Sequence, residues 1–360
     1  MPLLRVQYLN LLEVRCCVLT FDTARLEQAM ELAGEIVRSG RSVGAAIAVS
    51  SSQALIHEAF FSDSDANRVS PESRFLIASL TKPILATAVM QLVERGWLSL
   101  AAPVCLYLPE FSGKWKDRVN TWHLLAHTSG LPEISWQTTL EALPDRAVSY
   151  EAACAANLTF LPGMQVSYST LSFYLLAELL TRLGGQPYQR VLEDHVLEPL
   201  GMRATGWNPP RHLTVPVEGM TAGTELDQQT ATDSFISLQM PGAGLWSTLP
   251  DLVKFGQAQL NGNHVLNSHT QSWMTRDHTI HLQNADGETP HYGLAWRKRP
   301  LIGCWPGSPR AFEHDGAMGS LLWIDPEYDL VIVFLAATFM ADTRDVQHVI
   351  NAVYGALTTQ

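Results

Sequence analysis

Strand patterns stand at both ends of this chain, and helical patterns fill its middle. Near the start, the apolar runs 43–50 and 54–61 are separated by three polar residues, which predicts an antiparallel hairpin. Further strands are predicted near the end, over 291–299, 312–325 and 329–338. Strands from the two ends can bury their apolar faces together only if they share one sheet. We therefore predict an α/β fold of the α+β kind, in which helices flank an antiparallel sheet.

Helical spacing of apolar residues lies between and beside these strands. The ranges with this spacing are 24–38, 79–94, 171–185, 187–201 and 344–357. A chain of 360 residues is also longer than one core usually supports. We predict a sheet domain built from 1–82 and 230–360 and a mainly helical inserted domain over 83–229.

The charge balance narrows the classes of partner. The chain has 24 Lys and Arg against 35 Asp and Glu, a formal net charge of −11, without a basic run. Such a surface repels nucleic acid and anionic membranes. We therefore expect a small-molecule or peptide partner and no nucleic-acid partner.

Cysteine usage and hydropathy indicate neither a disulfide framework nor a membrane span. The cysteines are odd in number and lack C-x-x-C spacing: Cys16, Cys17, Cys105, Cys154 and Cys304. The apolar stretch from Leu330 to Ala341 falls short of the roughly 20 residues that cross a bilayer. The first 20 residues contain charges where a secretory signal would be apolar. These observations predict a cytoplasmic protein.

A serine and a lysine three residues apart begin one of the predicted helices. Ser79 and Lys82 form an S-x-x-K sequence, and positions i and i+3 share one face of a helix. A serine hydroxyl becomes a strong nucleophile only when a neighbouring base takes its proton. The spacing therefore allows a nucleophile and base pair, although S-x-x-K alone is common by chance.

Two further motifs accompany this pair, Tyr168-Ser169-Thr170 before a helix and His314-Asp315-Gly316 in a late strand. With them the chain resembles the serine beta-lactamase and penicillin-binding-protein superfamily, most of all its class C beta-lactamase, esterase and D-aminopeptidase branch. Connecting segments such as HLLAHTSGLP, LEPLGM and PGAGLWSTLPDLVKFG are similar too. The resemblance runs from about residue 24 to 357 and implies a beta-lactamase-like fold, with the active site at the junction of the sheet domain and the inserted helical domain.

The resemblance also implies roles for individual residues. Ser79 would be the acylated nucleophile, with Lys82 and Tyr168 sharing the proton and Tyr168 as the general base. The backbone NH groups of Ser79 and Ala317 would form the oxyanion hole. Substrate would contact four residues of the second and third motifs, Thr170, His314, Asp315 and Gly316. A phenol with a usual pKa near 10 needs a nearby cation to lose its proton, and Lys82 is the candidate. No metal or cofactor is implied.

Two departures from the family pattern bear on the substrate. Thr170 stands where Y-x-N has its asparagine, and His314-Asp315 replaces the lysine and threonine of the beta-lactamase K-T-G motif. Asp315 would repel a substrate carboxylate if it faces the pocket, whereas only the lysine is lost if it faces away. A histidine titrates near 6.5, so we expect activity to depend on pH through His314.

These departures favour a neutral carboxylic ester as the substrate. A beta-lactam and a D-amino-acid peptide or amide remain alternatives. A protein that is acylated without turnover, as a sensor or binding module, is the alternative from another class.

Two other patterns compete for a functional role. Ser42 lies in G-x-S-x-G, but it follows a predicted helix and precedes a strand, the reverse of a nucleophile elbow. His123 and His127 have the i, i+4 spacing of a zinc pair without the glutamate of H-E-x-x-H. We expect these histidines to be packed or hydrogen-bonded parts of a helix.

Overall fold

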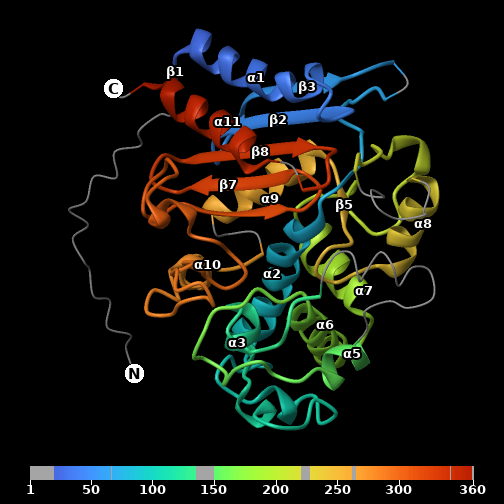
Figure 1. Ribbon diagram of the computed structural model, residues 1–360, viewed down its shortest axis with the longest axis vertical. Coiled ribbons are helices and arrows are strands. Elements are labelled where there is room, and N and C mark those ends of the chain that lie inside the picture. Colours follow the sequence, from blue (N-terminus) through green and yellow to red (C-terminus); the bar gives the residue numbers. More distant parts are fainter. Residues whose placement is uncertain are drawn as a thin grey trace, which may run out of the picture.

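The computed structural model describes residues 20–65, 67–134, 150–219, 228–261, 265–340 and 342–358. Its largest sheet has five antiparallel strands in the order β3-β2-β8-β7-β6, and in Figure 1 the helices α2 (Thr81–Glu94), α3 (Thr121–Leu125), α5 (Tyr150–Ala155) and α6 (Leu171–Gly184) lie on the other side of the molecule from α1 (Thr23–Arg38). The strands are β2 (Gly44–Ser50), β3 (Leu55–Ser62), β6 (Phe312–Gly316), β7 (Ser320–Asp325) and β8 (Leu330–Ala336). Ile47 of β2 pairs with Ala59 of β3 on one side and with Phe334 of β8 on the other. Strands from both ends of the chain therefore share one sheet, which confirms the predicted fold class.

Two of the predicted strands differ from the observed ones. The stretch 312–325 is a hairpin rather than one strand, because Gly319 has a φ of +82° and its amide donates to Gly316 O at 3.0 Å. The stretch 291–299 forms no strand, since His291 and Ala295 have φ values of +54° and +60°. Only isolated bridges occur there, among them one between Arg297 and Glu313.

Helices cover both faces of the sheet, as its two-residue alternation requires. On one face, Ala45, Ile47 and Val49 pack with α1 (Thr23–Arg38) and α11 (Thr343–Ala356). On the other face, Ala46 and Ala48 belong to the apolar cluster that includes α9 (Leu249–Asn261). Two short strands, β1 (Thr20–Phe21) and β9 (Leu357–Thr358), pair the two ends of the described chain.

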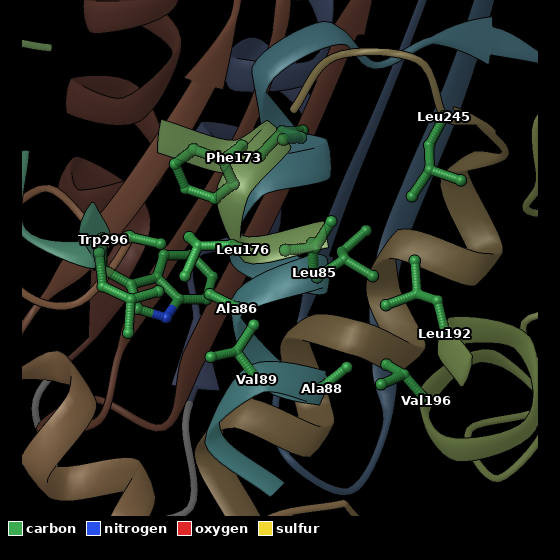
Figure 2. Close-up of a cluster of buried hydrophobic side chains, with 14 of the residues drawn as sticks. Leu85, Ala86, Ala88, Val89, Phe173, Leu176, Leu192, Val196, Leu245 and Trp296 are labelled. Carbon is green, nitrogen blue, oxygen red and sulfur yellow. The ribbon is translucent and has the colours of Figure 1, made fainter. Parts of the chain in front are cut away.

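The apolar cluster that contains Ala46 and Ala48 continues from the sheet into the helices of the middle of the chain. Figure 2 shows side chains of α2, α6 and α7 (Tyr188–Leu192) converging with Leu245 and Trp296. All residues from Thr81 to Leu92 of α2 are buried, so this helix runs through the core. The helices are α2 (Thr81–Glu94), α3 (Thr121–Leu125), α5 (Tyr150–Ala155), α6 (Leu171–Gly184), α7 (Tyr188–Leu192), α8 (Gln228–Leu238) and α10 (Ser268–Thr275).

Short elements connect these helices. A π-helical turn, Glu193–Leu197, follows α7, and the strands β4 (Phe75–Leu76) and β5 (Trp246–Ser247) pair beside α2. The 3-10 turns are Ala78–Leu80, Val104–Leu106, Lys116–Arg118, Arg211–Leu213 and Arg299–Ile302.

The largest apolar cluster contains residues of the sheet and of the middle helices together. The division into a sheet domain and an inserted helical domain stays a prediction. Within the described ranges, no helix combines the length and the apolar character that crossing a membrane requires. Cys105, Cys154 and Cys304 are free thiols, while Cys16 and Cys17 lie outside the described residues.

Candidate active site

Ser79 lies in the 3-10 turn Ala78–Leu80, directly before α2. Ala78 has a φ of +43°, a backbone conformation that costs energy for a residue with a side chain. Ser79 is partly exposed, whereas its neighbours from Phe75 to Ala78 and from Leu80 to Leu92 are buried. The strained turn therefore presents one hydroxyl to solvent at the start of a buried helix.

Lys82 lies one helical turn beyond Ser79 and has no solvent-exposed surface. Its Nζ donates to Ser79 Oγ at 3.1 Å and to Gly242 O at 3.0 Å. Burial lowers the pKa of Lys82 from 10.5 to about 7, and the charge of Arg297 lowers it further while Glu133 opposes the shift. A large part of the Lys82 population is therefore a neutral amine at neutral pH, with a lone pair that can take a proton.

Tyr168 completes this group from the segment before α6. Its hydroxyl interacts with the Ser79 side chain, and Lys82 Nζ lies 4.7 Å from its ring centroid. Burial raises the pKa of Tyr168 well above 10, with Arg297 as the main opposing charge. The direction is opposite to the one expected from the sequence, and the opposing cation is Arg297 rather than Lys82. In this geometry the phenol of Tyr168 keeps its proton at neutral pH, and its role as the general base stays a prediction.

His127 supports Tyr168 instead of pairing with His123. Its ring stacks on Tyr168 with centroids 4.4 Å apart, and its Nδ1 accepts the Ser169 NH at 3.1 Å. With a φ of +57° it lies beyond the end of α3, whereas His123 lies in α3 and accepts the Asn120 NH at 3.2 Å. His123 therefore matches the expectation of a helical residue, and His127 does not. Among the described residues, no cluster of three potential metal ligands occurs.

The end of β6 is held against the turn that carries Ser79. A Cβ atom on Gly316 would lie 2.3 Å from Ile77 O, and the Ser320 hydroxyl donates to the same oxygen at 2.9 Å. Only glycine allows this approach. Ala317 follows directly, so the two backbones predicted to form the oxyanion hole lie close together.

His314 is buried and neutral. Its Nδ1 lies 2.7 Å from Asp315 O, so the proton is on Nδ1 and Nε2 is an acceptor without a partner. Burial lowers the pKa of His314 to about 3, with Arg297 as the next cause. The expectation that this ring titrates near 6.5 is therefore wrong, because the sequence did not reveal its burial.

Asp315 contacts two arginines that the sequence reasoning did not identify. Its Oδ1 accepts from Arg297 Nη1 at 2.6 Å, and its Oδ2 accepts from Arg299 Nη2 at 2.7 Å. Arg297 also donates to the Tyr292 hydroxyl at 2.8 Å and lies 5.6 Å from the Tyr168 ring. The carboxylate is therefore beside the site and partly exposed, but its charge is paired. The segment HYGLAWRKR is the signal that could have directed attention to these arginines.

Thr170 is held by a second residue that the sequence reasoning missed. Its hydroxyl donates to Glu133 Oε1 at 2.8 Å, and its NH donates to Glu133 Oε2 at 2.5 Å. Glu133 is exposed as a residue, but its carboxylate lies against the site, where burial raises its pKa and Lys82 opposes the shift. The one hydroxyl hydrogen of Thr170 is therefore occupied, and the group presented at this position is a carboxylate.

Ser42 has the environment of a structural serine. It is 1% exposed, donates to Gly44 O at 2.8 Å and accepts the Ala337 NH at 2.9 Å. It lies between the end of α1 and the start of β2, as the sequence predicted. Neither a helix nor open space follows it, so its surroundings do not fit a nucleophile.

Comparisons with known proteins show the family of this chain. A family model described as Beta-lactamase matches residues 24–353. Esterase EstB of Burkholderia gladioli is 33% identical over 215 residues, which cover 54% of this chain and 54% of EstB, so the chain spans about half the length of this relative. The D-alanyl-D-alanine-carboxypeptidase/endopeptidase AmpH of Escherichia coli K12 is 26% identical over 291 residues, 73% of this chain and 71% of that one.

Solved structures share the fold at lower identity. EstCE1, a hydrolase with promiscuous acyltransferase activity, superimposes with a TM-score of 0.77 at 20% identity, covering 92% of this chain and 99% of its own. The D-amino acid amidase of Ochrobactrum anthropi SV3 gives a TM-score of 0.73 at 18% identity with the same coverage. At these identities the likeness shows the fold.

Proposed function

The chain belongs to the beta-lactamase family, whose fold carries serine hydrolases, and from that premise we propose that it hydrolyses neutral carboxylic esters through an acyl-enzyme at Ser79. The observation that carries the proposal is the contact of 3.1 Å between Ser79 Oγ and the Nζ of Lys82, whose pKa is lowered to about 7 by burial. A nucleophile and a base that is neutral at working pH are the parts that acyl transfer needs.

In the proposed reaction, Ser79 Oγ attacks the ester carbonyl while its proton passes to Lys82 Nζ. The NH groups of Ser79 and Ala317 stabilise the oxyanion of the tetrahedral intermediate. The bond from carbon to the alcohol oxygen then breaks, and the alcohol leaves with a proton that Lys82 returns through the Tyr168 hydroxyl. Water attacks the acyl-enzyme, its proton goes to Lys82, and the acid leaves as Ser79 is protonated again.

The surroundings of Ser79 support an uncharged substrate. The paired Asp315 leaves no lysine-like free cation at the third motif, and Thr170 has no amide to hold an acyl-amide oxygen. An ester needs neither contact. The name of the relative EstB, an esterase, agrees with this choice.

A second candidate function is hydrolysis of an amide or peptide that carries a free amine. Glu133 supports it, because its carboxylate lies on Thr170 and interacts with Lys82 across the site. A substrate ammonium could pair with this carboxylate. Replacing Glu133 by glutamine should then lower kcat/KM for a D-amino-acid anilide about tenfold or more relative to a neutral ester, the usual range for a lost charged hydrogen bond.

The test is time-resolved product release from a p-nitrophenyl ester, a chromogenic cephalosporin and a D-amino-acid anilide. Ser79→Ala should lower ester turnover on the order of a thousandfold or more, and Ser42→Ala is the matched control that should keep it. Release of one equivalent without turnover would instead identify an acylated sensor. Full ester activity in Ser79→Ala would refute the proposal, and cleavage of only the cephalosporin or the anilide would refute the choice of substrate.

A further inference from the structure

Arg297 is a charged group beside the reacting residues that the proposed reaction does not use. Its guanidinium lies 5.6 Å from the Tyr168 ring, and its side chain keeps 25% of its surface exposed. Asp315, Gly316 and Ala317 are partly exposed at the same end of β6. A cation therefore lies at the edge of the site, within reach of a substrate group.

This cation is already engaged within the protein. Arg297 donates from Nη1 to Asp315 at 2.6 Å and from Nε to the Tyr292 hydroxyl at 2.8 Å. Asp315 in turn uses its second oxygen for Arg299 at 2.7 Å, and Arg299 lies 3.1 Å from Glu313. The side chains of Arg297, Asp315, Arg299 and Glu313 thus form one chain of contacts along β6.

The pairing of Arg297 with Asp315 persists over the whole physiological pH range. Burial opposes ionisation of Asp315, but the charges of Arg297 and Arg299 outweigh the effect of burial. The pKa of Asp315 is therefore lowered from its usual value. Burial likewise opposes the charge of Arg297, but Asp315 and the surrounding tyrosines and Glu313 raise its pKa above the usual value. Neither Asp315 nor Arg297 changes charge near neutral pH, whereas burial raises the pKa of Glu313 to about 7, with Arg299 opposing the shift.

We propose that Asp315 is a specificity-determining residue, which keeps Arg297 occupied and so selects neutral substrates over substrates that carry a carboxylate. The proposal rests on the proposed function of Ser79. A carboxylate that approached Arg297 would meet the charge of Asp315 and would have to displace a charge-assisted hydrogen bond already formed. A neutral ester meets no such cost, because it does not compete for the guanidinium.

The direct consequence is that loss of the Asp315 charge should create a carboxylate site. With asparagine at this position, Arg297 keeps its place but presents an uncompensated charge. Hydrogen bonds to charged groups contribute enough to change kcat/KM by about tenfold to a hundredfold. Loss of the Asp315 charge should not raise kcat/KM for a neutral substrate.

The experiment uses a matched pair of substrates, 3-(butanoyloxy)benzoate and its methyl ester, which differ by one leaving-group carboxylate. The wild type should prefer the methyl ester about tenfold or more in kcat/KM. Asp315→Asn should shift the ratio toward the carboxylate about tenfold or more, and added salt should reduce this shift.

Two variants serve as controls. Glu313→Gln removes a neighbouring carboxylate that pairs with Arg299, and it should leave the ratio near the wild-type value. Adding Arg297→Met to Asp315→Asn should abolish the gain, because the freed guanidinium is then absent. Ratios compare two substrates on one enzyme, so a general loss of activity cancels.

The proposal is overturned if the wild type prefers the carboxylate, a measurement that needs no variant. It is also overturned if folded Asp315→Asn hydrolyses the methyl ester with a ratio within about twofold of wild type, well below the change a freed charge should give. A failure of the proposed function looks different, because the wild type would then hydrolyse neither ester and a fluorophosphonate would not label Ser79.

Discussion

Replacing Lys82 by methionine should stabilise the protein at neutral pH while it removes the proposed base. Burial lowers the pKa of Lys82 from 10.5 in the unfolded chain to about 7 in the folded chain. Between these two values the unfolded state binds more protons, so stability rises with pH. This linkage costs the folded state about 4 kcal/mol at pH 7 and about 1 kcal/mol at pH 9.5. Methionine has no proton to lose, so the variant does not bear this cost.

The absolute change also includes the hydrogen bond from Lys82 to Gly242 O, whose loss leaves a buried carbonyl unpaired. The difference between variant and wild type is therefore best followed as a function of pH. The free energy of unfolding of Lys82→Met minus that of the wild type should decrease by about 3 kcal/mol from pH 7 to 9.5. The lost hydrogen bond contributes equally at both pH values and does not affect this change.

Urea unfolding at several pH values measures this difference. The exposed Lys114 is the matched control, and Lys114→Met should show no such slope. A Lys82→Met variant that follows the wild-type pH dependence would refute the assignment of a lowered pKa to Lys82. Ester turnover measured alongside should be lost at every pH.

Two further predictions concern β6. His314→Gln should leave the pH dependence of kcat/KM unchanged between about pH 5 and 8. Burial lowers the pKa of His314 to about 3, so the change in kcat/KM near pH 7 comes from Lys82, whose pKa is about 7. A change in the apparent pKa of kcat/KM in this variant would contradict the prediction. Gly316→Ala should destabilise the protein by about 1–3 kcal/mol and lower ester turnover, because its Cβ would lie 2.3 Å from Ile77 O. Gly355→Ala is the control, since its Cβ would have nothing within 4 Å, and calorimetry should show an unchanged unfolding temperature.

The regular elements were predictable wherever the pattern is local. The helices predicted at 24–38 and 344–357 and the hairpin of β2 and β3 are present in the structure. They were predictable because the apolar spacing that indicates them lies within each segment. The split of 312–325 at Gly319 and the turns in 291–299 were missed. Positive φ values at His291 and Ala295 have no signature in residue type, because neither residue is glycine.

The chain by itself determined which groups are available for chemistry. Ser79 and Lys82 were identified from their spacing and Tyr168 from the resemblance to a known family, and the structure brings the three side chains together. A helix turn fixes the first two relative to each other, so their contact depends little on the rest of the fold.

Only the tertiary structure decided the charge of these groups and their partners. The neutral state of His314 and the lowered pKa of Lys82 both result from burial, which depends on what other segments pack around them. The partners of Asp315 and Thr170 are Arg297 and Glu133, which lie 18 and 37 residues away in the chain. No local pattern encodes such contacts, because they form only when separate segments fold against each other.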